Sequence, residues 1–436
     1  MSNASGALPL DWSRDAVAER RRRYLSPLID TFTNYDQPLL LRSGSMQYLY
    51  GADGRRYVDC ISQNLTISVG HGHPAVLDAV RHQLEDFQHC STMFLHPAAA
   101  HAAEELVATM PPGDWVVHFL NSGSEAVDLA FQMARVFTRN TDVVALRNAF
   151  HGTQLTAMAA TGMASCRQPI ASPGGFLHTE NPDAYRGVSA ESDFYLDALD
   201  RLLDTSGSGR LAALIIEPML GYGGVLPLPE GYMQGAVERV RAHGGIAIVD
   251  EVQTGVGRLG KGLWAFVQHG VTPDIVVAGK GLSNGFPLSA VIARREIAEA
   301  MTGRRFFNTY GANPMSCTAV RAVLATVERE DLVANADRVG SRLMTRFEAL
   351  RQKHAIVGDV RGEGLMIGVE LVTDRQSKTP AAEEARRVTD TLREGGVVLG
   401  RSGHHRNVLR FSPPLCITEA DADTVADVLD HALGAA

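Results

Sequence analysis

The sequence predicts an α/β protein in which a large domain with a mainly parallel sheet is joined to a smaller α+β domain built from both chain ends. Three observations predict this fold. From residue 75 to about residue 313, short and nearly continuous apolar runs alternate with amphipathic segments, as buried parallel strands and their covering helices do. After residue 313, longer helices and fewer strands are indicated. With 436 residues, the chain is also long enough for two packed domains.

The chain divides into three predicted parts: an N-terminal segment, 1–70, that joins the small domain, a large domain, 71–315, and a C-terminal small domain, 316–436. The N-terminal segment contains two short strands around residues 52–54, because Ala-Asp-Gly favours a tight turn. An amphipathic helix follows Pro74. The later elements expected are five buried strands (115–120, 142–146, 211–218, 246–251, 274–279), a long helical stretch (317–354), a strand region (357–372), a helix from 381, a strand near 407–414 and a last helix (419–433).

Composition and charge exclude several classes of protein. The formal net charge of −8 provides no basic field for nucleic acid, so no nucleic-acid partner is expected. No apolar run approaches the roughly 18 residues of a membrane span, and the first 15 residues show no secretory signal. Five scattered cysteines without a C-x-x-C pair are typical of reduced thiols and not of a disulfide framework or zinc ribbon. We therefore expect a cytoplasmic protein.

Residues 255–260 read GVGRLG, which matches the Gly-x-Gly-x-x-Gly fingerprint of dinucleotide-binding proteins. That fingerprint requires its first glycine directly after a strand and a helix that opens at its last glycine. Here residues 250–253 intervene after the strand, and the segment beyond Gly260 is short and flanked by glycine. We therefore interpret these glycines as turn residues and not as a nicotinamide site.

Two charged residues follow neighbouring buried runs. Asp250 comes directly after the apolar run at 246–249, and Lys280 follows the run at 275–278. The carboxyl ends of parallel strands meet at the edge where open α/β sheets bind ligands. An amine and a carboxylate at this edge suit pyridoxal 5'-phosphate, because the lysine forms a Schiff base with its aldehyde and the carboxylate keeps the ring nitrogen protonated. A structural salt bridge is the alternative for the pair.

A phosphate site is indicated where a third strand meets its helix. The strand at 115–120 is followed by Gly123 and Ser124, which open a predicted helix. Backbone N–H groups and the helix dipole at such an end bind a dianion. Ser122 and Glu125 have the spacing of a capping box, which is the structural alternative for these two residues.

Taken together, these motifs resemble the class III (ω-type) aminotransferases, which are pyridoxal-phosphate enzymes of fold type I. The similarity extends from about residue 48 to the C-terminus. Within the class, the sequence motifs are most similar to those of the alanine–glyoxylate aminotransferases and the ethanolamine-phosphate phospho-lyases. The segments that carry it are NSGSEA, NAFHG, IIEPMLGYGG, IVDEVQTGVGRLGK, DIVVAGKGLSNGFPLSA, FNTYGANPMSC, GDVRGEGLMIGVEL and VLRFSPPL.

The resemblance implies roles around the cofactor ring. Lys280 is the Schiff-base lysine and also moves the proton between substrate and cofactor, which requires a neutral amine and hence a lowered pKa. Asp250 pairs with the ring nitrogen, and Gln253 bonds the ring hydroxyl. Val252 packs on one ring face and Phe150 on the other, where most relatives have tyrosine.

Further positions follow from the same resemblance. Gly123 and Ser124 hold the phosphate, and Thr309 reaches it from a partner subunit, which implies a homodimer with shared active sites. Glu217 lies near the ring hydroxyl. His151 is assigned to the cofactor site with a structural role as its alternative. No metal is expected.

Substrate recognition is expected to depend on Arg410. By resemblance this arginine binds a substrate carboxylate in a bidentate fashion, and a structural salt bridge is its alternative. Ornithine- and GABA-type relatives carry a glutamate that pairs with this arginine, whereas the corresponding position here is Tyr222. We therefore expect Arg410 to remain available to substrate, or the donor to be handled differently.

The function implied is transfer of an amino group from an amine or ω-amino acid, of the β-alanine, β-aminoisobutyrate or alanine type, to pyruvate or glyoxylate. The cycle is a ping-pong Schiff-base mechanism. The alternative is a lyase that eliminates phosphate from ethanolamine phosphate or a similar amino-alcohol phosphate. Residues 404–415 resemble the lyases, but these tend to carry lysine at the position of Arg410. A non-catalytic relative is disfavoured because Lys280 and Asp250 are both present.

Overall fold

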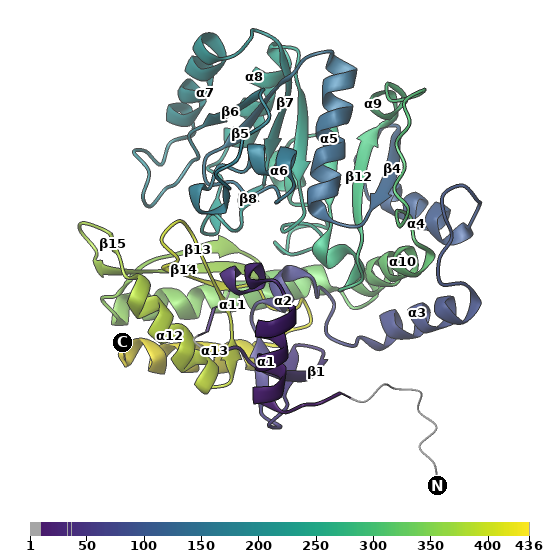
Figure 1. The fold of residues 1–436 in the computed structure, drawn as a ribbon. Helices are drawn as coiled ribbons and strands as arrows, with labels where there is room; N and C mark the ends of the chain where they lie inside the picture. Colours follow the sequence, from purple (N-terminus) through teal and green to yellow (C-terminus); the bar gives the residue numbers. More distant parts are fainter. Residues whose placement is uncertain (1–9, 33, 36, 436) are drawn as a thin grey trace.

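The computed structural model describes residues 10–32, 34–35 and 37–435. The first nine residues, on which the expected absence of a secretory signal partly depends, lie outside the described residues. Figure 1 shows two parts, a large domain around one twisted sheet and a smaller domain beneath it. The predicted fold class is confirmed: the molecule is an α/β protein with a mainly parallel central sheet.

The large domain is built on a seven-stranded sheet. Its central strand β10 is buried at every position, because parallel strands are covered by helices on both faces. β10 pairs in parallel with β7 and β11, whereas β12 runs antiparallel to β11 and β4. In spatial order the strands are β4 (Trp115–Leu120), β12 (Ser289–Arg294), β11 (Ile275–Ala278), β10 (Ile246–Asp250), β7 (Leu211–Ile216), β5 (Asp142–Leu146) and β6 (Phe176–Thr179).

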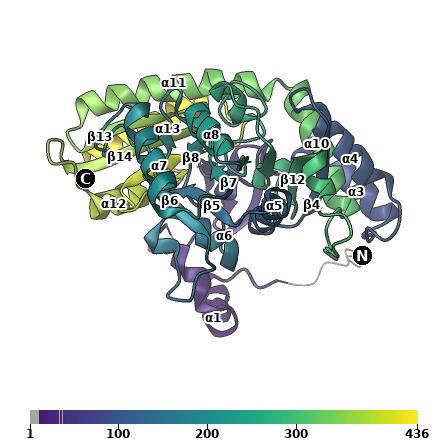
Figure 2. The same cartoon turned by 90° about the horizontal axis from the view of Figure 1, so that it is seen from above.

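Helices cover both faces of this sheet, as Figure 2 shows from above. α5 (Gly123–Thr138) packs against β7, β11 and β12, because its alanine-rich face allows close approach to the strands. On the opposite face lie α7 (Ser192–Ser206) and α8 (Tyr232–Ala242). The shorter elements of this domain are α6 (Leu155–Ala160), η2 (Ala164–Cys166), β8 (Met219–Leu220), β9 (Leu226–Pro227), η3 (Ala265–His269), η4 (Lys280–Ser283) and α9 (Arg295–Glu299).

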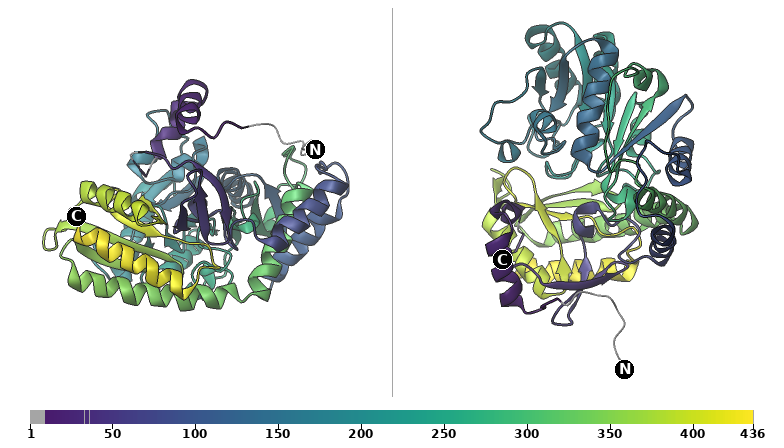
Figure 3. Two further views of the ribbon diagram at one scale, coloured as in Figure 1. Left: turned by 90° about the horizontal axis from the view of Figure 1, so that it is seen from below. Right: turned by 45° about the vertical axis from the view of Figure 1, so that its right-hand side comes forward.

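Both chain ends build the small domain, as predicted. The N-terminal strand β3 pairs in parallel with β16 from the C-terminal part, and Figure 3 shows N-terminal segments, in purple, beside the C-terminal part, in yellow. One sheet contains β1 (Leu41–Ser45), β2 (Tyr48–Gly51), β3 (Arg56–Asp59) and β16 (Val397–Val398). The other contains β13 (Val357–Glu363), β14 (Met366–Asp374), β15 (Thr379–Pro380), β17 (Gly400–Ser402) and β18 (Val408–Phe411). The boundaries predicted at 70/71 and 315/316 stay predictions.

The predicted helical stretch 317–354 is two helices. α10 and α11 are separated by Glu330 and Asp331, and Asp331 has a φ of 48°, which ends the first helix. α10 packs against α3 and α4. The helices outside the large-domain sheet are α1 (Arg14–Tyr24), η1 (Pro27–Phe32), α2 (Ser62–Leu65), α3 (Pro74–Asp86), α4 (Pro97–Ala108), α10 (Pro314–Arg329), α11 (Leu332–Lys353), α12 (Ala382–Glu394) and α13 (Glu419–Gly434).

The GVGRLG segment is a loop of the large domain that packs against the small domain. No helix opens at Gly260, and turns continue to η3. A Cβ on Gly260 would lie 2.6 Å from the backbone of Asp337 in α11, so only glycine allows this approach. The buried Arg258 donates hydrogen bonds to the carbonyls of Leu365 and Pro413 in the small domain. Close packing between the domains therefore explains why this loop contains glycine.

Candidate active site

Asp250 and Lys280 lie at the ends of neighbouring parallel strands. Asp250 ends β10 and is in register with Val277 of β11, while Lys280 begins η4 just beyond β11. Lys280 has a φ of 45°, a conformation rare for residues other than glycine and often found at functional sites. Its side chain lines a cavity of about 350 Å³. Burial lowers the pKa of Lys280 to about 8, although the nearby charge of Asp250 opposes this.

The Asp250 carboxylate is held from two sides. Its Oδ2 atom lies 2.8 Å from Nδ1 of His151, and its Oδ1 atom accepts the backbone N–H of Val252 at 3.1 Å. The residue is 5% exposed, so its charge requires such partners. The structure thus places His151, for which the sequence left a structural role open, in direct contact with Asp250.

A second buried acid orients the backbone on the far side of the site. Glu217 accepts the backbone N–H of Phe150 and that of Gly221, each at 3.0 Å. Burial raises the pKa of Glu217 to about 7, while His151 lowers it. The ring of Phe150 meets the ring of Tyr222 edge to face, with centroids 5.5 Å apart, and both residues line the cavity.

Glycines allow close packing around the start of α5. A Cβ on Gly123 would approach Val252 at 3.3 Å, and one on Gly152 would lie 2.5 Å from the Ser124 Oγ. The Ser124 hydroxyl accepts the backbone N–H of Thr153 at 3.1 Å. These glycines and the N-terminus of a 16-residue helix form a cradle of the kind that binds phosphate.

The capping box predicted here is only half formed. The Ser122 hydroxyl accepts the N–H of Glu125 at 3.3 Å. The Glu125 carboxylate, however, accepts the N–H of Asn121 at 3.0 Å and not that of Ser122. It also accepts from the side chain of Asn308 at 3.0 Å, and this contact ties the helix start to the segment before Thr309.

Arg410 lines the same cavity as Lys280. Its side chain is buried, and burial lowers its pKa to about 10. Its Nη2 donates to the side-chain oxygen of Asn64 at 2.7 Å, and its Nη1 to that of Gln253 at 3.4 Å. Both of these partners are neutral amides, and no acid is found among the described residues that line the cavity.

Sequence reasoning did not assign Asn64 or Arg406 to the site, and both line this cavity. Asn64 belongs to α2, where Ser62 to Leu65 all have φ values between 48° and 64°. Such a left-handed turn of non-glycine residues is costly and has no periodic sequence signal. The tolerance of asparagine for this conformation was the only available clue.

Five of the predicted site residues line the cavity, namely Phe150, Tyr222, Gln253, Lys280 and Arg410, and Thr309 does not. It is exposed, and its expected role is to reach the site of a partner subunit. Within the described part of the chain, no group of three or more His, Cys, Asp or Glu residues has a metal-binding arrangement. No described helix is long and apolar enough to cross a membrane.

Comparison with known proteins places this geometry in a family. Residues 33–433 match the family described as aminotransferase class III. The chain belongs to the class III aminotransferases. It is 42% identical, over 97% of its length and 88% of the relative's, to alanine–glyoxylate aminotransferase 2 homolog 2, mitochondrial, of Arabidopsis thaliana.

Two further relatives bear on the function. An ethanolamine-phosphate phospho-lyase homolog 1 of Caenorhabditis elegans is 35% identical over 97% of this chain and 94% of its own. An amine transaminase from an uncultivated Pseudomonas species, in the PLP-bound form, is 30% identical. It superposes with a TM-score of 0.86 over 94% of this chain and 97% of that chain.

Membership of the class III aminotransferases confirms three predictions. The chain is an enzyme, its fold is that of the fold type I transaminases, and its cofactor is pyridoxal phosphate. The residues present fit this cofactor, because a phosphate cradle, a lysine of lowered pKa and an anchored carboxylate surround one site. The cytoplasmic location stays a prediction, since the Arabidopsis relative is named mitochondrial.

Proposed function

We propose that this aminotransferase moves an amino group from an amine or ω-amino acid to pyruvate or glyoxylate in a ping-pong cycle. The donor is of the β-alanine, β-aminoisobutyrate or alanine type. The observation that carries the proposal is that Arg410 and Lys280 line one cavity, where the arginine donates hydrogen bonds to two neutral amides. A planar guanidinium suits the carboxylate of a keto acid or amino acid, and the lysine lies where amino groups are exchanged.

When bound, pyridoxal phosphate supplies an aldehyde that takes up the amino group and a ring that withdraws electrons from the substrate carbon. Asp250 is assigned to the ring nitrogen, and the contact with His151 holds its carboxylate in place. Val252 and Phe150 are assigned to the two ring faces. Gln253 is assigned to the ring hydroxyl, so its bond to Arg410 links the cofactor site to the substrate site.

The remaining cofactor contacts are assigned to the helix start and the partner subunit. Gly123 and Ser124 bind the phosphate with backbone N–H and hydroxyl groups. Glu217 holds the backbone of Phe150 and thereby orients the stacking ring. Thr309 of one subunit reaches the phosphate of the other.

Lys280 moves the proton during transfer. With the cofactor bound, its Nζ would accept the proton that the substrate carbon loses and would later give it up, which requires the neutral amine. Burial favours this form because it lowers the pKa to about 8. Most of the amine is therefore ready to accept a proton at mildly alkaline pH.

Arg410 binds the substrate carboxylate. In exchanging Asn64 and Gln253 for a carboxylate, the guanidinium gains charge-assisted hydrogen bonds. Tyr222, which stands where some relatives carry a glutamate, contributes no competing charge at neutral pH because burial raises its pKa. This arrangement favours an arginine that is available to keto acids and amino acids alike.

A homodimer is part of this proposal. Met93, Phe94 and Leu95 are exposed apolar residues, as are Phe307 and Tyr310. Thr92 and Phe307 line one shared groove, so the two segments form a single apolar surface. Exposed patches of this kind are typical of protein–protein interfaces, and this one contains the segment of Thr309.

Elimination of phosphate from ethanolamine phosphate is the second candidate. The C. elegans phospho-lyase homolog supports it, as does Arg406, because a further guanidinium in the cavity, in addition to those of Arg401 and Arg410, suits a phosphate group. The higher identity to the Arabidopsis aminotransferase homolog and the presence of Arg410 favour amino transfer.

Two assays on the holoenzyme separate these functions. Alanine should convert the bound cofactor to its amino form, as seen in the absorbance spectrum, and pyruvate should reverse the change. Ethanolamine phosphate should release no inorganic phosphate. Lys280→Ala should abolish the reactions with alanine and with pyruvate, and it should also abolish covalent cofactor attachment. Release of phosphate without need for a keto acid establishes the lyase instead.

A further inference from the structure

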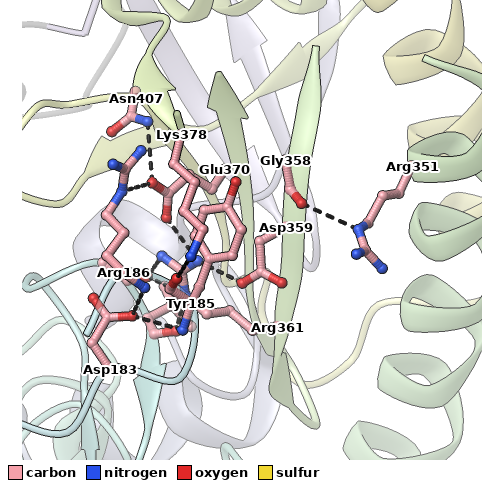
Figure 4. Close-up of polar contacts among 12 residues, drawn as sticks. Asp183, Tyr185, Arg186, Arg351, Gly358, Asp359, Arg361, Glu370, Lys378 and Asn407 are labelled. Atoms are coloured by element: carbon pink, nitrogen blue, oxygen red, sulfur yellow. Dashed lines mark hydrogen bonds and ion pairs between the residues drawn. The ribbon is translucent and has the colours of Figure 1, made fainter. Parts of the chain in front are cut away.

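A buried carboxylate lies between two arginines, as Figure 4 shows. Glu370 of β14 is 2% exposed. Its Oε2 pairs with Nη1 of Arg361 at 2.7 Å, and its Oε1 accepts from Nε of Arg186 and from the side chain of Asn407, the latter at 3.3 Å. Although burial raises the pKa of Glu370, the two arginines hold it below its ordinary value. The carboxylate is therefore charged at neutral pH.

Arg361 connects this carboxylate to the segment that follows Tyr222. Its Nε donates to the carbonyls of Gly224 and Val225 at 3.1 and 3.0 Å, and its Nη2 donates to Gly224 at 2.7 Å. Val225 has a φ of 53°, an outlier for a β-branched residue. A conformation of this cost persists only where surrounding contacts enforce it, and the guanidinium supplies three of them.

Asn407 connects the same carboxylate to the segment that carries Arg406. Besides Glu370, the Asn407 amide donates to the carbonyl of Leu371 at 2.7 Å. The Gly403 N–H at the start of this segment donates to the carbonyl of Tyr222 at 3.0 Å. Arg406 and Tyr222 both line the substrate cavity. The two segments that form this part of its wall are therefore bonded to each other and to one ion pair.

We propose that the Glu370–Arg361 ion pair positions the outer wall of the substrate cavity, fixing Tyr222 and Arg406 relative to each other and so setting substrate affinity. Both residues act through these two segments and not on the cofactor, since neither lines the cavity of Lys280. The inference rests on the proposed function only in that the cavity is where amino donor and keto acid bind.

Glu370→Gln tests this role, because it keeps the shape of the side chain and removes its charge. The KM for both donor and keto acid should rise by about tenfold, a modest effect for a displaced binding group, while kcat falls less than twofold. The absorbance of the bound cofactor and its change with pH should stay as in the wild type. This split between KM and kcat is not expected from a general loss of stability.

Asp421→Asn provides a matched control. Asp421 is also a buried carboxylate of the small domain, with hydrogen bonds from Gln47 at 2.7 Å and Tyr48 at 2.6 Å, but it lines no part of the cavity. It should lower the thermal unfolding temperature as Glu370→Gln does and leave both KM values unchanged. Equal KM values in the two variants would overturn the proposal.

A double-mutant cycle with Tyr222→Ala tests whether the effect passes through the wall. If Glu370 acts by placing Tyr222, the two substitutions together should raise KM by clearly less than the product of their separate effects. Fully multiplicative effects would contradict the inference. A wild-type enzyme that fails to react with alanine refutes the proposed function, whereas a reactive wild type with an unchanged Glu370→Gln refutes only the positioning role.

Discussion

Lys280 owes its predicted reactivity to burial and backbone geometry. The residue is half-buried, and desolvation together with the charges of Asp250, Arg410 and Glu217 lowers its pKa to about 8. An ordinary lysine has a pKa of 10.5 and carries almost no neutral amine near neutral pH. A lowered value increases the fraction of amine that is able to attack an aldehyde.

The rate at which the apoprotein attaches pyridoxal phosphate should therefore rise with pH to a midpoint near 8, and not near 10.5. The sign follows from deprotonation, because only the neutral amine forms the bond. Stopped-flow absorbance measures the rate, and a lysine peptide under the same conditions corrects for titration of the cofactor itself. A protein midpoint that coincides with that of the peptide would refute the assigned environment.

At this scale, the sequence identified the residues that follow strand ends. Asp250 and Lys280 were predictable because apolar runs mark the strands and parallel strands align their carboxyl ends. Asn64 was not predictable, since the left-handed turn that brings it to Arg410 has no periodic signal. The contact of His151 with Asp250 joins residues 99 positions apart, and local pattern does not encode it.

Among the elements, helix α11 shows how a glycine is required by packing and not by a turn. Gly340 lies within α11 (Leu332–Lys353), and a Cβ there would lie 2.1 Å from the carbonyl oxygen of Gly364. Gly364 in turn packs against Leu259 of the interdomain loop. The helix, the β13–β14 connection and the loop thus meet where no side chain fits.

Gly340→Ala should destabilise the protein by about 1–3 kcal/mol, the usual cost of overpacking. This reverses the sign expected for an open helix, where alanine is better than glycine by about 0.5–1 kcal/mol. Urea unfolding of the holoenzyme measures the difference. Ser341→Ala, at an exposed position of the same helix, is the control and should change the stability by less than about 0.5 kcal/mol. A variant Gly340→Ala that is as stable as wild type contradicts the packing argument.

Elements were predicted well where apolar runs were long. All five buried strands predicted for the large domain exist, whereas β6 and β12 of the same sheet were missed. β6 is half-buried at three of its four positions, so it lacks a continuous apolar run. The break between α10 and α11 was missed because it depends on one residue, Asp331, in a left-handed conformation, which helical periodicity does not reveal.

On the scale of the whole molecule, the apolar side chains of residues 93–95, 306–307 and 310 are exposed in the single chain. Leu95 is fully exposed and Phe307 is 58% exposed. Burial of such side chains stabilises association by roughly 25 cal/mol per Å² of apolar surface. A second copy of the chain is the proposed occupant.

Phe307→Glu should shift the protein from dimer to monomer, because a charge at the centre of an apolar interface is left without a partner. Sedimentation velocity measures the shift. Cofactor retention on dialysis should fall in parallel, since Thr309 would no longer reach a neighbouring site. Val188→Glu, at another exposed apolar residue, should leave both properties unchanged. A dimeric Phe307→Glu variant would place the interface elsewhere.

The pairing of β3 with β16 has a consequence for the order in which the molecule takes shape during synthesis. The first three strands leave the ribosome early, but the strand that completes their sheet emerges more than 300 residues later. Until then they expose an open edge, which is the kind of surface that aggregates or recruits chaperones. The strands of the large-domain sheet all lie between β3 and β16 in the sequence. The large domain is therefore able to fold first, and both ends of the chain then pack against it.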